Sequence, residues 1–160
     1  MGSPSPPSSI TAGNGTLSTY RRPRLKALPG LRDSGVTHVV TLLSQQEGAR
    51  QLGSAVKAAG LEWTWIPLPN AGPPSPEHDH HLGASLMQLA GILRDGGHIL
   101  LHCSAGIHRT GMFTYALLRF TGMTAADATS SLQQVSADFL ANVGDDRLTW
   151  ANRLYATWRG

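Results

Sequence analysis

Short apolar segments alternate with amphipathic ones along this chain, and this alternation is what most constrains its fold. The segments 36–43, 62–68 and 98–102 are apolar, and Gly, Ser, Pro or polar residues bound them, so they are predicted strands. Apolar residues recur at helical spacing between and after them, over 49–59, 82–93 and 112–120. The alternation favours a parallel sheet with helices packed on its faces.

The length of 160 residues fits a single α/β domain. We expect a central, mostly parallel sheet flanked by helices. A helical C-terminal section follows, in which Thr124 and Asp127 have the spacing of a capping box and 151–158 form the last helix. We predict a flexible Ser/Pro/Gly-rich segment over 1–15, within which Asn14-Gly15 has the pattern of a hairpin turn, and a domain over 16–160.

Composition excludes several classes of protein. A single cysteine excludes an internal disulfide framework and a zinc site built on several thiolates. No window has the length and apolarity of a membrane helix, and the N-terminus lacks the basic and apolar regions of a secretory signal, so we expect a cytoplasmic protein without membrane insertion. Pro23 interrupts the basic cluster over 21–26 and Pro29 follows it, which favours a solvated segment over nucleic-acid binding.

Chemistry concentrates in residues 102–111, which read His-Cys-Ser-Ala-Gly-Ile-His-Arg-Thr-Gly. They lead from the end of an apolar strand into a helix, where ligands of α/β folds bind and where the helix dipole stabilises a thiolate at Cys103. Arg109 can return to the same point and offer two parallel bonds to phosphate oxygens. Gly106 permits the tight turn, and Thr110 places a hydroxyl near the sulfur.

The Cys-x5-Arg-Thr spacing in this strand–loop–helix setting resembles the phosphate-binding loop of the cysteine-dependent protein tyrosine phosphatases. The motif is similar to the tyrosine-specific branch, while the length and short connections resemble the small, bacterial-type dual-specificity enzymes. This resemblance extends over roughly residues 16–160. It implies a protein phosphatase that needs no metal or other cofactor and acts on proteins or peptides that contain phosphotyrosine.

The resemblance also implies residue roles. Cys103 would attack phosphorus to form a phosphocysteine intermediate, Arg109 would bind the equatorial oxygens, and Thr110 would support the thiolate as it leaves. His102 would tune the cysteine from behind. The backbone N–H groups of the loop would complete a phosphate cradle formed by Ser104, Ala105, Gly106, Ile107, His108 and Arg109.

The family's general acid is an aspartate after the preceding strand, and here that position holds Asn70, whose amide cannot donate an acidic proton. One alternative is that another residue supplies the proton; the candidates are His108, Asp79 and Glu77. A second is that the enzyme works without an acid on good leaving groups, which favours phosphotyrosine over phosphoserine or phosphothreonine. A third is a catalytically weak protein that binds phosphorylated residues, or an Asn70 that was introduced in place of a natural residue.

Four aromatic residues have two interpretations. Trp63, Trp65, Tyr20 and Tyr115 are expected mainly in the core, with a phosphotyrosine slot as the alternative. Neither the physiological substrate nor the oligomeric state follows from the sequence.

Overall fold

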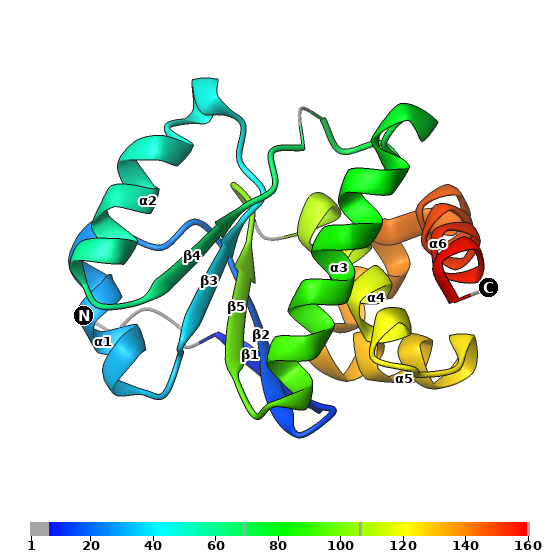
Figure 1. The fold of residues 1–160 in the computed structure, drawn as a ribbon, viewed down its shortest axis with the longest axis horizontal. Helices are drawn as coiled ribbons and strands as arrows, with labels where there is room; N and C mark the ends of the chain where they lie inside the picture. The colour runs from blue at the N-terminus through cyan, green and yellow to red at the C-terminus, as the bar shows by residue number, and fades with distance from the viewer. Residues whose placement is uncertain (1–6, 69, 106, 160) are drawn as a thin grey trace.

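The computed structural model describes residues 7–68, 70–105 and 107–159, and Figure 1 shows a twisted sheet between two layers of helices. Its strands are listed in chain order: β1 (Ser8–Ala12), β2 (Gly15–Tyr20), β3 (His38–Thr41), β4 (Glu62–Trp65) and β5 (His98–His102). Their order in the sheet is β1-β2-β5-β3-β4, in which β1 is antiparallel to β2 and every other pairing is parallel. The predicted mostly parallel α/β sheet is therefore confirmed. Because four strands run in one direction, their carboxyl ends meet at one edge.

Helices cover both faces of the sheet (Figure 1). The α-helices are α1 (Leu28–Asp33), α2 (Ala49–Ala58), α3 (Asp79–Arg94), α4 (His108–Phe120), α5 (Ala125–Val135) and α6 (Ala137–Arg159), and the 3-10 helices are η1 (Leu25–Ala27), η2 (Gln45–Glu47) and η3 (Pro76–His78). Helices α1 and α2 lie on one face, and α3 to α6 lie on the other. None of the helices in the described ranges combines the length and hydropathy needed to cross a membrane.

The alternation of side chains along β5 explains the two layers. Ile99 and Leu101 belong to the apolar core under α3 to α6, whereas Leu100 between them belongs to the core under α1 and α2. A strand buried on both faces must be largely apolar, and the three central residues of β5, Ile99 to Leu101, are apolar and buried. This burial fixes the end of β5, where Cys103 follows.

The N-terminal hairpin differs in detail from the prediction. Residues 8–12, which we placed in a flexible segment over 1–15, pair with β2 in register from Ser8–Thr19 to Ala12–Gly15. The two-residue turn is therefore Gly13-Asn14 and not Asn14-Gly15. Gly13 has a φ of +60°, and glycine adopts this left-handed conformation without strain. Ala12 and Leu17 are buried, so the hairpin contributes to the core.

The helical C-terminal section is confirmed, but its last helix is longer than predicted. Residues 137–159 are helical apart from Gly144, whose φ of 77° and ψ of 160° break the regular geometry. The predicted helix over 151–158 is therefore the second part of α6. Of the predicted capping box at the start of α5, the structure shows the N-cap half, in which the Asp127 amide donates to Thr124 Oγ1 over 3.1 Å.

Candidate active site

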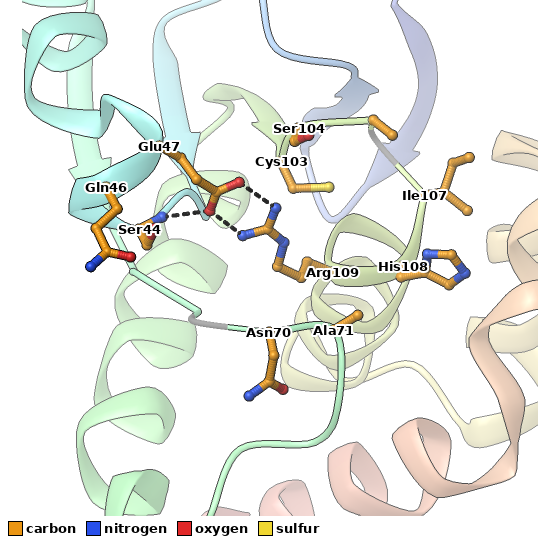
Figure 2. A pocket seen from close by; sticks show the side chains of 11 residues that line it. Ser44, Gln46, Glu47, Asn70, Ala71, Cys103, Ser104, Ile107, His108 and Arg109 are labelled. Atoms are coloured by element: carbon orange, nitrogen blue, oxygen red, sulfur yellow. Dashed lines mark hydrogen bonds and ion pairs between the residues drawn. The ribbon is translucent and has the colours of Figure 1, made fainter.

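A cavity of about 450 Å³ opens at the carboxyl edge of the parallel strands (Figure 2). Three segments form it: the loop between β5 and α4, the region around η2 after β3, and the loop that follows β4. Its lining residues are Ser44, Gln46, Glu47, Asn70, Ala71, Cys103, Ser104, Ala105, Ile107, His108 and Arg109. The start of α4 faces this cavity, so the positive end of the helix dipole and its first backbone N–H groups favour an anion there.

Cys103 lies at the floor of the cavity, directly after β5, and only 3% of its surface is exposed. Thr110, in the first turn of α4, donates its hydroxyl to Cys103 Sγ over 3.1 Å. A hydroxyl that donates to sulfur stabilises the thiolate more than the thiol, because the negative charge strengthens the hydrogen bond. Strand end and helix start thus bring together two residues that are seven apart in sequence.

Arg109 extends across the cavity to Glu47 with a bidentate ion pair. Its Nη1 donates to Glu47 Oε1 over 2.7 Å, and its Nη2 donates to Oε2 over 2.9 Å. Nη1 also donates to the Leu68 carbonyl over 3.1 Å. The pair raises the pKa of Arg109, mainly through the hydrogen bond to Glu47. Figure 2 shows that the remaining edge of the guanidinium, with Nε and Nη2, faces Cys103. This edge is suited to a phosphate above the sulfur.

Glu47 is a site residue that sequence reasoning missed. Its hydrogen bond from Arg109 lowers its pKa from 4.5 to about 2, with further lowering from Ser44. The Ser44 backbone amide donates to Glu47 Oε1 over 3.0 Å in a capping box, and the Arg22 side chain donates to the Glu47 carbonyl. The spacing Ser44-x-x-Glu47 directly after a strand was the signal that would have drawn attention to it. The carboxylate is therefore fixed in place before any ligand binds.

His102 lies behind the cavity and is completely buried. Its Nδ1 lies 3.1 Å from the Cys103 carbonyl, which only accepts, so this nitrogen holds the proton. The neutral ring then accepts at Nε2 from Thr41 Oγ1 over 2.8 Å, and Thr41 accepts from Trp63 Nε1 over 2.8 Å. Burial lowers the pKa of His102 from 6.5 to about 4, so the ring is neutral at physiological pH. His102 thus contacts Cys103 through the main chain.

Asn70 lies on the wall of the cavity, where the sequence places the acid position. Its Oδ1 accepts a hydrogen bond from the Gly72 amide over 2.9 Å, which closes a turn, and its side chain points away from Cys103 (Figure 2). In this structure Asn70 therefore shapes the loop after β4 and has no contact with the sulfur.

The three other acid candidates lie in different surroundings. His108 is exposed and lines the cavity, with its ring directed away from Cys103 (Figure 2). Glu77 has 78% of its side chain exposed and accepts from Ser75. Asp79 pairs with Arg153 over 2.8 Å. Only His108 of the three is a lining residue of the cavity.

Comparison with protein families matches residues 16–123 to Tc-R-P, described as a polymorphic toxin system, DSP-PTPase phosphatase. The match covers more than half of the chain. The chain belongs to this family. The predicted membership of the cysteine-dependent phosphatase superfamily is thereby confirmed. No curated protein matches the chain.

Solved phosphatase structures share the fold of this DSP-PTPase family member. A kinase associated phosphatase, with its catalytic-site cysteine replaced by serine, superimposes with a TM-score of 0.81 over 99% of this chain and 98% of that chain, at 13% identity. The active form of Tk-PTP gives 0.71 over 93% and 97%, at 23% identity. A cysteine-to-serine variant of P. aeruginosa TpbA in complex with pTyr gives 0.57 over 89% and 86%, at 20% identity.

The structure brings most of the predicted site residues of this phosphatase to one cavity. Ser104, Ala105 and Ile107 line it beside Cys103, His108 and Arg109, whereas Gly106 lies outside the described residues. The alternative of an aromatic slot is wrong for Trp63, Trp65, Tyr20 and Tyr115, because none of them lines the cavity. Among the described residues, no group of three or more His, Cys, Asp or Glu side chains is placed to hold a metal ion.

Proposed function

We propose that this chain is a protein phosphatase that hydrolyses phosphotyrosine through a phosphocysteine intermediate on Cys103. One observation carries the proposal. Cys103, Thr110 and the open edge of the Arg109 guanidinium converge at the start of α4, within a cavity large enough for a phosphorylated side chain. The family membership, with its phosphatase description, supports the same chemistry.

The reaction proceeds in two displacements. The Cys103 thiolate attacks phosphorus, a sulfur–phosphorus bond forms, and the bond from phosphorus to the phenolic oxygen breaks. Arg109 and the backbone N–H groups of the loop bind the phosphoryl oxygens in both steps. Water then attacks phosphorus, releases inorganic phosphate and returns the thiolate, which the Thr110 hydroxyl stabilises as it leaves.

Phosphotyrosine is favoured over phosphoserine and phosphothreonine because of the acid position. The Asn70 amide cannot protonate the leaving oxygen, and its side chain points away from Cys103. Phenolate is a far better leaving group than an alkoxide, so loss of acid catalysis slows a tyrosine substrate least. TpbA, a structural neighbour, was solved in complex with pTyr. The extent of the phosphatase domain over 16–160 and a cytoplasmic location stay predictions.

Phosphate release from a phosphotyrosine peptide tests the proposal. The wild-type chain should turn over, and Cys103→Ser should reduce turnover by more than about a thousandfold. Rapid acid quenching of the wild type should trap a phosphorylated protein that is absent from the serine variant. Turnover retained by Cys103→Ser would exclude the covalent mechanism. Reduced wild-type protein that binds the peptide without turnover would instead identify a phospho-residue-binding protein.

A further inference from the structure

The segment 70–75, here called the 70–75 loop, separates two cavities. Asn70 and Ala71 line the phosphate-sized cavity described above. Asn70, Gly72 and the two prolines that follow line a second cavity of about 420 Å³, which lies between the loop and the start of α3. A segment with a cavity on each side has few van der Waals contacts to hold it. The position of the 70–75 loop must therefore depend on its hydrogen bonds.

Arg147 of α6 supplies the hydrogen bond that ties this loop to the body of the protein. Its Nε donates to the Ala71 carbonyl over 2.5 Å, and its Nη1 donates to the Val143 carbonyl over 2.7 Å. The guanidinium thus links two main-chain oxygens that are far apart in sequence. The other hydrogen bonds given for the loop are local. The Gly72 amide donates to Asn70 Oδ1, and at the far end Ser75 donates to Glu77 and accepts from the His78 amide, so neither end of the loop is tied by them to α6 or the sheet.

The Val143 end of this link is firmly fixed. Val143 is buried, and a Cβ atom added to Gly111 of α4 would lie only 2.7 Å from Val143 Cγ2, so the two helices approach closely here. Gly144 then leaves helical geometry with a positive φ, which interrupts the regular backbone pattern just before Arg147. Arg147 therefore extends from a helix that packs on α4, the helix that carries Arg109.

We propose that Arg147 is a positioning residue that holds the 70–75 loop as a fixed wall of the phosphate cavity. The inference rests on the proposed function, since it assigns a purpose to the wall of that site. Because the wall is held in place without a ligand, binding of an oxyanion does not require the loop to close. Loss of the link should free the loop and weaken oxyanion binding without any change in Cys103, Arg109 or Glu47.

Three measurements on the whole chain test this role: backbone order parameters, vanadate affinity and steady-state kinetics. In Arg147→Ala the backbone order parameters of Ala71 and Gly72 should fall from about 0.85 to below about 0.6. Vanadate affinity should fall about tenfold, the scale of one lost hydrogen bond. On para-nitrophenyl phosphate the same variant should raise KM more than it lowers kcat. Arg153→Ala, a matched loss of an α6 arginine whose ion pair is with Asp79, should leave all three quantities unchanged.

If only the positive charge of Arg147 mattered, the variants at this position would differ from one another in another way. Arg147→Met and Arg147→Lys separate the two explanations, because lysine keeps the charge but cannot span both carbonyls with a planar fork. If vanadate affinity followed the charge, with lysine equal to wild type and the order parameters unchanged in all variants, the positioning role would be excluded. Equal losses in Arg147→Ala and Arg153→Ala would exclude it as well. A wild type that binds vanadate without turnover would contradict the proposed function, but the order parameters and the vanadate affinities would still test the role of Arg147.

Discussion

Two loops meet over the same cavity and are held in very different ways. The Cys103–Arg109 loop lies between the buried end of β5 and a helix, and Arg109 is tied to Glu47 by a bidentate ion pair. The 70–75 loop has an exposed Asn70 and a second cavity behind it. Arg147 ties it to α6, and the other hydrogen bonds given for its described residues are local. In the first loop both partners of the ion pair are charged and partly buried, whereas a charged donor on a neutral carbonyl and local turns hold the second.

The two loops correspond to two parts of the proposed reaction: attack on the phosphoryl group and protonation of the leaving group. The Cys103–Arg109 loop has the groups that we propose bind a phosphoryl group and attack it, and these tasks need exact placement and little else. The 70–75 loop includes the position that the family resemblance assigns to the general acid, and there Asn70 closes a turn. We therefore expect changes in the first loop to remove activity and changes in the second to tune it.

Replacement of Arg109 by lysine should give the largest effect among these predictions. Lysine keeps the positive charge but cannot bond Glu47 with one edge and phosphate with the other. We expect kcat/KM on a phosphotyrosine peptide to fall by about 10²–10³-fold, as when a transition-state donor is lost. Steady-state kinetics measure this, with Arg32→Lys at an exposed ion pair as the control. Near-normal activity in Arg109→Lys would show that the paired geometry is unimportant.

Replacement of Asn70 by aspartate should increase activity. A carboxyl group at this position restores a proton donor, which contributes about 10²-fold or more where it is well placed. We expect the gain on phosphoserine peptides and alkyl phosphates, and little change on para-nitrophenyl phosphate, whose leaving group needs no proton. The pH dependence of kcat should gain a descending limb at higher pH.

The outcome for Asn70→Asp has a clear alternative. If turnover of poor leaving groups does not rise, the loop after β4 is not the acid position of this chain. His108, the acid candidate that lines the cavity, is then the residue to replace. A loss of the alkyl-phosphate activity in His108→Ala, together with a shifted pH profile, would assign the proton to it.

Replacement of Glu47 by glutamine should have a smaller effect than the change at Arg109. Glutamine keeps the shape and one acceptor but removes the negative charge that orients Arg109. We expect KM to rise about tenfold with a smaller change in kcat, because Arg109 remains present but is less well fixed. Gln46 lines the same cavity. Adding Gln46→Glu to Glu47→Gln therefore tests whether a nearby carboxylate restores the KM. An unchanged KM in Glu47→Gln would show that the loop alone holds Arg109.

The Cys103–Arg109 loop was largely predictable from the sequence, because its site residues lie close together along the chain. Cys103, Arg109 and Thr110 lie within eight consecutive residues of one strand–turn–helix segment, so their spacing alone places them together. Glu47 is 62 residues from Arg109, and only the parallel pairing of β3 with β5 brings it to the cavity. Its capping-box spacing was visible in the sequence, but the partner of the carboxylate was not.

The 70–75 loop was predictable only in outline. Its proline-rich composition indicates a loop, and alignment with the acid position identifies Asn70. Its anchor on Arg147 comes from α6, whose first part was not predicted because Gly144 and two aspartates interrupt the apolar pattern. The Gly13-Asn14 turn was missed by one residue for a similar reason, since the strand register, and not the dipeptide, sets the turn.

His102, which is buried behind the Cys103–Arg109 loop, should affect the pH dependence of stability more than catalysis. The pKa of His102 is lowered from 6.5 to about 4, so the unfolded chain binds a proton in this pH range that the folded chain does not. The free energy of unfolding should therefore fall as the pH drops from 6.5 to 4, by up to about 3 kcal/mol. Burial lowers the pKa of His98 as well, and this adds to the fall in the same direction.

Urea unfolding of the wild type and of His102→Asn at pH 7, 6 and 5 measures this dependence. Asparagine cannot titrate, so the slope of stability against pH should decrease in the variant and keep only the share of His98 and other groups. Glu47 does not affect this comparison. Its pKa is lowered from 4.5 to about 2, so its contribution to the free energy of unfolding is lost mainly below pH 4.5, outside the range of the experiment. Equal slopes in the two proteins would mean that the pKa of His102 is the same in the folded and unfolded chains, so that the buried ring also gains a proton below its usual pKa. In that case the hydrogen-bond chain from Trp63 through Thr41 to the Cys103 carbonyl would have to be rebuilt around a charged ring.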